Sequence, residues 1–149
     1  MKPEQFLQLW QDKPQEEVEK ALKTLLNHRL EQAGNHLEWA KVCEELNYHN
    51  LAFREVQLAV RDQPQELSAL QKLSEMLIER GNSLRAQLHL ERLLEISPEH
   101  VFALEHLIDI YALQGNQDRI NELQTQLDKL GFSTQTSSLL DIDKEQQEP

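Results

Sequence analysis

Few side chains in this sequence combine the residue type and the spacing that catalysis or metal binding requires. Cys43 is the only cysteine, and a reactive thiol would need a cation or a base beside it to lower its pKa. His106 with Glu105 and Asp109 could hold a metal ion, since residues three or four apart share one helix face. No second ligand pair with tight spacing accompanies them, and the other histidines are scattered. We therefore expect a solvated polar surface here and no metal site.

The motifs of common enzyme classes are also missing from the sequence. It contains no HExxH, no glycine-rich phosphate loop, no CxxC and no GxSxG. We predict that the protein is not an enzyme and uses no cofactor. The first residues lead into no apolar signal region or spanning segment, so we expect a cytoplasmic protein that does not enter a membrane. A single cysteine also excludes an internal disulfide framework.

The elements that must position these side chains are helices. Apolar residues recur at helical spacing, as in Leu70, Leu73 and Leu77, and no long run alternates polar and apolar residues as a strand would. The fold class is therefore all-α. Asn35 followed by Glu38 predicts a capping box, and Ser97-Pro98 predicts a cap before a proline in the first helical turn. The helices are expected near 3–12, 15–31, 36–46, 50–62, 65–80, 84–96, 99–113 and 117–129.

The sequence also repeats itself with a period of 34 residues. Pairs at this separation include Pro64 and Pro98, Ala52 and Ala86, Leu70 and Leu104, and Gly81-Asn82 and Gly115-Asn116. The period divides the chain into blocks 33–66, 67–100 and 101–134. A repeat of this length indicates stacked helix pairs, which present an extended surface and rarely enclose a catalytic pocket. The protein is therefore expected to act by holding a partner.

These blocks resemble tetratricopeptide repeats, which carry apolar or small residues at fixed positions of two helices. The middle block matches with Leu70, Leu73, Ser74, Leu77, Gly81, Ala86, Leu90, Leu93 and Pro98. The first block matches except at His36, which stands where the pattern has an apolar residue, and the second half of the last block is degenerate. The resemblance implies a helical-hairpin solenoid in which Cys43 points inward as a packed thiol. It covers roughly two-thirds of the chain and is specific to the repeat class.

The two ends of the chain depart from the repeat. Val18, Leu22 and Leu25 fit the second helix of a fourth, decayed block, with a short helix around Phe6 before it. A capping or dimerising segment is the alternative, which leaves open a homodimer through the N-terminal helices. We predict a repeat domain over 1–134 and a flexible acidic tail over 135–149.

The charge of the chain favours basic partners. Lys and Arg number 15 against 26 Asp and Glu, a formal net charge of −11. Such a field repels nucleic acid backbones and anionic lipid, so we expect no direct nucleic acid binding. An acidic balance also aids solubility, which is the plainer explanation for overall charge.

The tetratricopeptide resemblance implies a concave groove lined by the first helix of each pair. The residues carried over to this groove are Leu37, Glu38, Lys41, Glu45, Gln71, Lys72, Glu75, Ile78, Phe102, Glu105, His106 and Asp109. They are mainly acidic with apolar residues interspersed, which suits a basic, partly apolar peptide or helix of another protein. The lysine, asparagine and arginine residues that clamp a chaperone's carboxyl terminus in some members are mostly absent. An acidic chaperone tail is therefore not the expected partner.

Two kinds of interaction protein fit this sequence. One is an adaptor or scaffold that holds a basic segment of a larger assembly. The other is a small cytoplasmic chaperone for subunits of a secretion system or another multiprotein assembly. Acidic three-repeat proteins of this size resemble secretion chaperones, although no long apolar N-terminal dimerisation helix is recognisable here.

Overall fold

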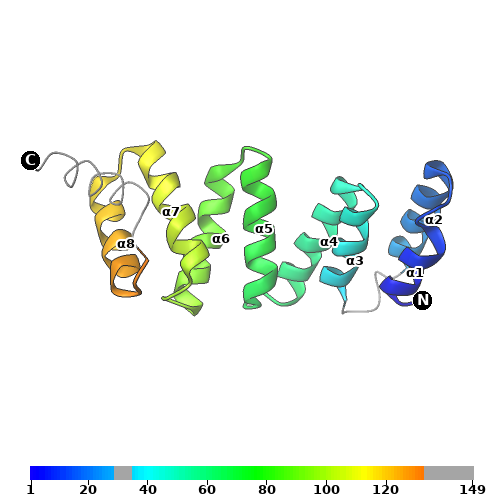
Figure 1. Ribbon diagram of the computed structural model, residues 1–149, viewed down its shortest axis with the longest axis horizontal. Helices are drawn as coiled ribbons and strands as arrows, with labels where there is room; N and C mark the ends of the chain where they lie inside the picture. The colour runs from blue at the N-terminus through cyan, green and yellow to red at the C-terminus, as the bar shows by residue number, and fades with distance from the viewer. Residues whose placement is uncertain (29–34, 133–149) are drawn as a thin grey trace, which may run out of the picture. The chain divides into compact units, whose positions relative to one another are not determined.

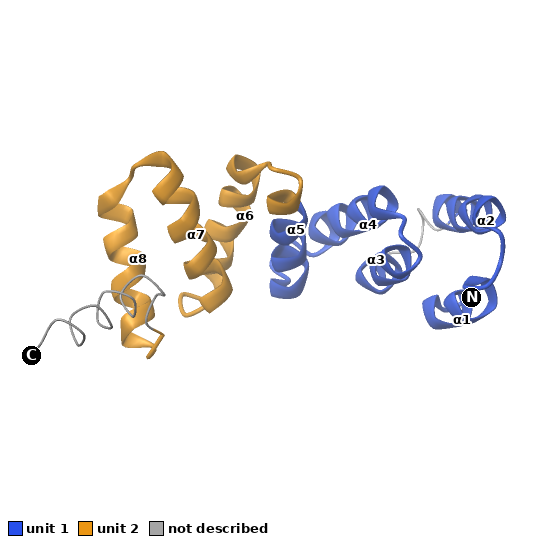
Figure 2. Cartoon of the chain, turned by 45° about the horizontal axis from the view of Figure 1, so that its top comes forward, with its two compact units in different colours: residues 1–76 blue, residues 77–149 orange. Residues whose placement is uncertain are grey.

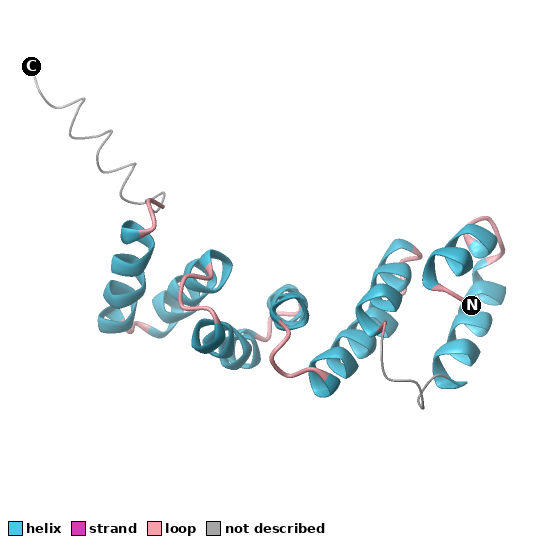
Figure 3. Ribbon diagram, turned by 90° about the horizontal axis from the view of Figure 1, so that it is seen from below, coloured by secondary structure: helices cyan, strands magenta, loops and turns pink. Residues whose placement is uncertain are grey.

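The computed structural model describes residues 1–28 and 35–132, and every regular element in these ranges is a helix (Figures 1 and 3). This confirms the predicted all-α helical repeat. The helices are α1 (Pro3–Trp10), α2 (Gln15–His28), α3 (His36–Glu45), α4 (His49–Asp62), α5 (Leu67–Glu79), α6 (Ser83–Ile96), α7 (Val101–Gln114) and α8 (Gln117–Lys129). No helix of the described ranges has the length and apolar character needed to cross a membrane.

The chain forms two compact units, Met1–Met76 and Leu77–Pro149 (Figure 2). Their boundary falls inside α5, so α1 to α4 belong to the first unit and α6 to α8 to the second. The predicted tail over 135–149 lies outside the described residues. The division into one repeat domain and a tail therefore stays a prediction.

The helix boundaries follow the period of the sequence. The second helix of each clear pair, α4, α6 and α8, begins at His49, Ser83 and Gln117, at intervals of 34 residues. The side chains of Asn82 and Asn116 cap α6 and α8, each accepting a hydrogen bond of 3.3 Å from the backbone N–H three residues later. These caps satisfy N–H groups that have no partner within the helix.

The turn between paired helices requires a left-handed backbone. Gly81 and Gly115 have φ values of +75° and +70°, as their positions after a first helix predict. Asn47 stands one period before Gly81 and has a φ of +66°. Asparagine tolerates this region better than most residues because its short polar side chain can form local hydrogen bonds. All three repeats therefore turn in the same way.

Two predicted caps are wrong. Asn35 has a φ of +65°, and its side chain makes no capping hydrogen bond, so the predicted capping box does not form. Ser97 ends α6, and α7 begins only at Val101, with the side chain of His100 accepting a hydrogen bond of 3.3 Å from the Ala103 N–H. Pro98 therefore lies in the turn between the helices and not in the first turn of α7.

The core of the first unit joins α1 to α3. Phe6 and Trp39 are both fully buried and meet edge to face, with ring centroids 5.8 Å apart. Val18 and Leu22 of α2 are buried as well. The apolar residues near the N-terminus therefore help to form the core of the first unit. Whether they also form a dimer interface stays a prediction.

The core of the second unit is mainly aliphatic. Leu90 and Leu93 of α6 and Leu104 and Leu107 of α7 are fully buried, and all four stand at positions where the period predicts an inward side chain. Ala86 is also fully buried, which fits the small residue that paired helices need where their backbones approach closely.

Candidate functional site

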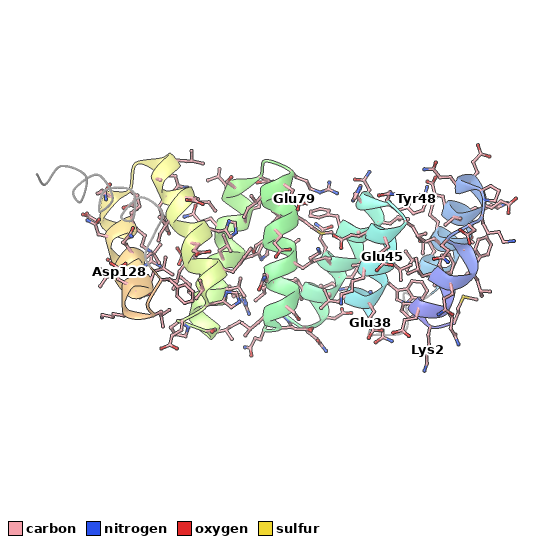
Figure 4. All side chains as sticks on the ribbon, in the orientation of Figure 1. Lys2, Glu38, Glu45, Tyr48, Glu79 and Asp128 are labelled. Carbon is pink, nitrogen blue, oxygen red and sulfur yellow. The ribbon has the colours of Figure 1, made fainter. Side chains whose placement is uncertain are left out.

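A cleft of about 560 Å³ lies between α1 and α3 in the first unit. Glu38, Lys41 and Glu45 of the predicted groove line it from α3. Figure 4 labels Glu38 and Glu45 on α3 and Lys2 just before α1. The residues that line this α1–α3 cleft are Lys2, Pro3, Glu4, Leu7, Asn35, Glu38, Lys41, Val42 and Glu45. Its floor is apolar and its rim is charged, with three carboxylates and two lysines.

A second cavity of about 490 Å³ adjoins this cleft and shares Asn35 and Glu38 with it. Its lining residues are Asn35, His36, Leu37, Glu38, Ala59, Asp62, Gln63 and Glu66, and we name it the His36 cavity. Leu37, another residue of the predicted groove, contributes to it. Taken together, the cleft and the cavity carry five carboxylates and two lysines. This surface of the first unit is therefore acidic.

His36 is largely shielded from water at a normally apolar position of the repeat, and its imidazole contacts two carboxylates of α4. Its Nδ1 lies 2.7 Å from Glu55 Oε2, and its Nε2 lies 3.2 Å from Asp62 Oδ2. Glu55 is only 3% exposed, so its carboxylate needs this partner in the protein interior. The repeat pattern has an apolar residue at the position of His36. Here a polar pair joins the two helices of the hairpin instead.

An ion pair between Lys72 of α5 and Glu44 of α3 joins these two helices within the first unit. Lys72 Nζ lies 2.9 Å from Glu44 Oε1 and 3.9 Å from Glu75 Oε2. Gln71 Nε2 donates a hydrogen bond of 3.2 Å to Glu75 Oε1. Lys72 therefore offsets part of the negative charge of Glu44 and Glu75.

The predicted residues of α7 form one surface in the second unit. Phe102 and His106 have ring centroids 4.2 Å apart, and His100 contacts Phe102 edge to face at 6.2 Å. Glu105 and Asp109 are exposed on the same side of α7, because residues at spacings of three, four and seven share a helix face. This α7 surface therefore combines a half-buried aromatic pair with two exposed carboxylates.

The predicted groove thus divides between the two units. Leu37, Glu38, Lys41, Glu45, Gln71, Lys72 and Glu75 belong to the first unit. Ile78, which is half-buried, belongs to the second together with Phe102, Glu105, His106 and Asp109. A single groove that unites all of these residues stays a prediction.

Sequence reasoning missed the contribution of α1 to the cleft. Lys2, Glu4 and Leu7 line it, although the repeat pattern gives no groove position before Ala33. The sequence clue to this contribution of α1 was the amphipathic stretch around Phe6. Because the helix buries Phe6 against Trp39, its neighbouring residues lie beside α3.

A second missed feature is a polar network inside the second unit. Glu91 of α6 accepts hydrogen bonds from the hydroxyl of Tyr111 and from the guanidinium of Arg119, the latter at 2.8 Å. Burial alone would lower the pKa of Arg119, but hydrogen bonds to Glu122, Tyr111 and Glu91 raise it above its usual value. The network ties α6, α7 and α8 together and leaves Glu91 committed to internal partners.

The candidate residues for chemistry have ordinary structural environments. Cys43 is fully buried, and burial, followed by the charges of Glu55 and Glu44, raises its pKa to about 12. The thiol therefore stays protonated at neutral pH and is a poor nucleophile. Across residues 1–28 and 35–132, no three His, Cys, Asp or Glu side chains are placed to hold a metal ion together.

Comparison with known proteins supports the fold. The chain matches no protein-family model and no curated protein sequence. Among solved structures it is similar to the crystal structure of MamA, with a TM-score of 0.63 and 17% sequence identity. The match covers 85% of this chain and 77% of that chain. Similarity at this level of identity shows a shared helical-repeat architecture.

Proposed function

We propose that this protein is a non-catalytic interaction module, an adaptor or scaffold that binds a basic, partly apolar segment of another protein. The main support is the surface formed by the α1–α3 cleft and the adjoining His36 cavity. It presents five carboxylates, of which Asp62 is paired with Arg61 and His36, against two lysines around the apolar side chains of Leu7, Leu37 and Val42. An amphipathic helix with lysine or arginine on its polar face matches both the apolar floor and the acidic rim.

The α7 surface is a second part of the proposal. Phe102 offers an aromatic anchor, and Glu105 and Asp109 offer carboxylates on the same helix face. Aromatic residues are frequent among the side chains that dominate binding energy at interfaces. If Phe102 is such an anchor, Phe102→Ala should weaken binding by about 1 kcal/mol or more, which is the loss that truncation of an anchoring side chain usually causes.

The direct test uses a defined probe and the full-length protein. The probe is a fluorescein-labelled amphipathic peptide of about 18 residues, built from leucine and lysine so that it forms a helix with one apolar face. Fluorescence anisotropy should show binding that weakens as salt shortens the Debye length toward about 8 Å. A matching peptide with glutamate in place of lysine should bind weakly or not at all.

Charge reversal locates the binding surface. Glu38→Lys with Glu45→Lys should weaken binding of the lysine peptide roughly tenfold or more, because both carboxylates line the cleft. Asp118→Lys with Asp128→Lys changes the net charge equally at exposed positions of α8 and should have little effect. Equal losses from both pairs would mean that only the overall field attracts the peptide, and the proposed site would be wrong. Glu55→Lys is unsuitable as a control because Glu55 is buried against His36.

The natural partner can be sought by pulldown and mass spectrometry with the wild-type protein and the Glu38→Lys/Glu45→Lys variant. A stable partner with a basic segment, captured by the wild type and lost with the variant, supports the adaptor. An aggregation-prone secreted client would instead support the chaperone alternative. Partners captured equally by both proteins would argue against the cleft as the binding site.

A further inference from the structure

The charges on the α3 wall of the α1–α3 cleft alternate in sign. Glu38, Lys41 and Glu45 are exposed, and all three line the cleft. Because they stand at spacings of three, four and seven residues, they lie on one face of α3. Lys41 stands about 4.5 Å along the helix axis from Glu38 and about 6 Å from Glu45. The wall therefore presents negative, positive and negative charge in order over a length of about 10.5 Å.

These three charged side chains are available to a partner. Every ion pair found among residues 1–28 and 35–132 joins other side chains. The neighbouring carboxylate of Glu44, which does not line the cleft, is instead paired with Lys72. A bound partner can therefore meet the charges of the α3 wall without breaking an ion pair that the protein makes within itself.

The opposite wall of the cleft consists of α1 and the residue before it. Lys2 and Glu4 contribute one charge of each sign, so this wall adds no net charge, and Leu7 contributes an aliphatic side chain. Val42 of α3 follows Lys41 directly and is only 4% exposed, so it belongs to the floor. The cleft therefore combines an apolar strip, formed by Leu7 and Val42, with the row of charges on α3.

We propose that the cleft selects its partner by the order of the partner's charges as well as by their sum. The preferred partner is an α-helix with a basic residue opposite Glu38, an acidic residue opposite Lys41 and a second basic residue opposite Glu45. An aliphatic side chain beside the acidic residue contacts Leu7 and Val42. This inference rests on the proposed function and narrows the partner to a segment with an acidic residue between two basic residues.

A helix suits this pattern because a second helix lying along α3 repeats the same rise per residue. Its two basic residues stand seven positions apart, with the acidic residue three or four positions from each. Lys41 lies near the middle of the row, so the match is the same in both directions of the bound helix. A helix with basic residues alone would place one of them beside Lys41, where like charges oppose binding.

Two fluorescein-labelled helical peptides of identical composition test the proposal on the full-length protein. Both have one leucine face and are basic overall. The first presents lysine, glutamate and lysine at spacings of three and four residues, and the second exchanges the glutamate with the lysine that follows it. Fluorescence anisotropy should show that the wild type binds the first peptide about five- to tenfold more tightly, because the exchange turns two attractions into two repulsions.

The same exchange in the protein should reverse this preference. Lys41→Glu with Glu45→Lys reverses the two charges and keeps the net charge at −11. This variant should bind the second peptide more tightly, by a similar factor. Neither the helicity of the peptides nor the overall field of the protein can cause such a reversal, because both stay the same. The fold should be retained, since a carboxylate four residues before an ammonium favours a helix, and circular dichroism checks this.

The matched control is the exchange Glu16→Lys with Lys20→Glu on α2, at exposed positions of the first unit that do not line the cleft. This variant should prefer the first peptide, as the wild type does. Equal affinities of the wild type for the two peptides would overturn the proposal and leave the basic-partner function standing. A preference for the first peptide that persists in Lys41→Glu/Glu45→Lys would also overturn it. Binding of neither peptide would overturn the proposed function together with this inference.

Discussion

The imidazole of His36 and the carboxylate of Glu55 lie 2.7 Å apart, although 19 residues separate them in the sequence. Both side chains are largely shielded from water, with exposed fractions of 12% and 4%. Their contact crosses from α3 to α4, where the repeat pattern would place apolar packing. A polar pair in such a position is specific in its partners, because either group alone would be buried without compensation.

The first prediction concerns this pair. His36→Leu should lower the free energy of unfolding by roughly 1–3 kcal/mol, because Glu55 loses its closest partner while it remains buried. The double variant His36→Leu/Glu55→Leu should recover much of that loss, since two apolar side chains restore the packing of the repeat pattern. Urea denaturation of the four proteins in this cycle measures the coupling. Simple additivity of the two single changes would show that the contact contributes nothing specific.

The second prediction concerns the close approach of paired helices. Ala86 is fully buried on α6, so Ala86→Leu should overpack the hairpin and cost roughly 1–3 kcal/mol of stability. Glu95→Leu adds an aliphatic side chain to an exposed position of the same helix and serves as the control. Thermal melts of both variants measure the difference. An unchanged midpoint for Ala86→Leu would place the small position of the repeat elsewhere.

The third prediction concerns Cys43. Because burial raises the pKa of its thiol to about 12, the folded protein should resist alkylation by iodoacetamide at pH 8 and react fully only after unfolding in guanidinium. The unfolded thiol ionises near the ordinary cysteine pKa of 9.0, so the stabilisation from the protonated thiol is complete below that pH. It should be lost as the pH rises from 9 toward 12. Rapid labelling of the native protein would show that Cys43 is accessible.

Much of the fold was predictable because it depends on local, periodic features. The spacing of Leu70, Leu73 and Leu77 predicted α5, and Gly81 and Gly115 predicted the turns after a first helix. These features need only the residues of one helix pair and its turn. The period of the sequence then carried the same prediction from one repeat to the next.

The candidate site was less predictable because its partners lie far apart in the sequence. The α1–α3 cleft combines residues of α1, such as Glu4, with residues of α3, such as Glu45, and nothing in the repeat pattern extends the groove to α1. The failure of Asn35 as a cap has a different cause. Its positive φ turns the backbone away from the extended conformation that a capping side chain needs, and residue type alone does not reveal this angle.

The last prediction separates backbone strain from packing in the turns. A Cβ atom added at Gly81 or Gly115 would meet no other atom within 4 Å, yet both residues have positive φ. Gly81→Ala and Gly115→Ala should therefore each cost about 1 kcal/mol through backbone strain alone. Asn47 occupies the equivalent position with a φ of +66°, so Asn47→Gly should be neutral or slightly stabilising, and Asn47→Ala should be destabilising.

Chemical denaturation of these four variants measures the effect, and circular dichroism checks that helix content is preserved. An exposed glutamine in a helix, such as Gln126→Ala on α8, is the control for an alanine that introduces no positive φ. Because Asn47, Gly81 and Gly115 stand one period apart, the strain should be similar at all three positions. If Asn47→Gly were as destabilising as Asn47→Ala, the asparagine side chain and not the left-handed backbone would be what the first repeat requires there.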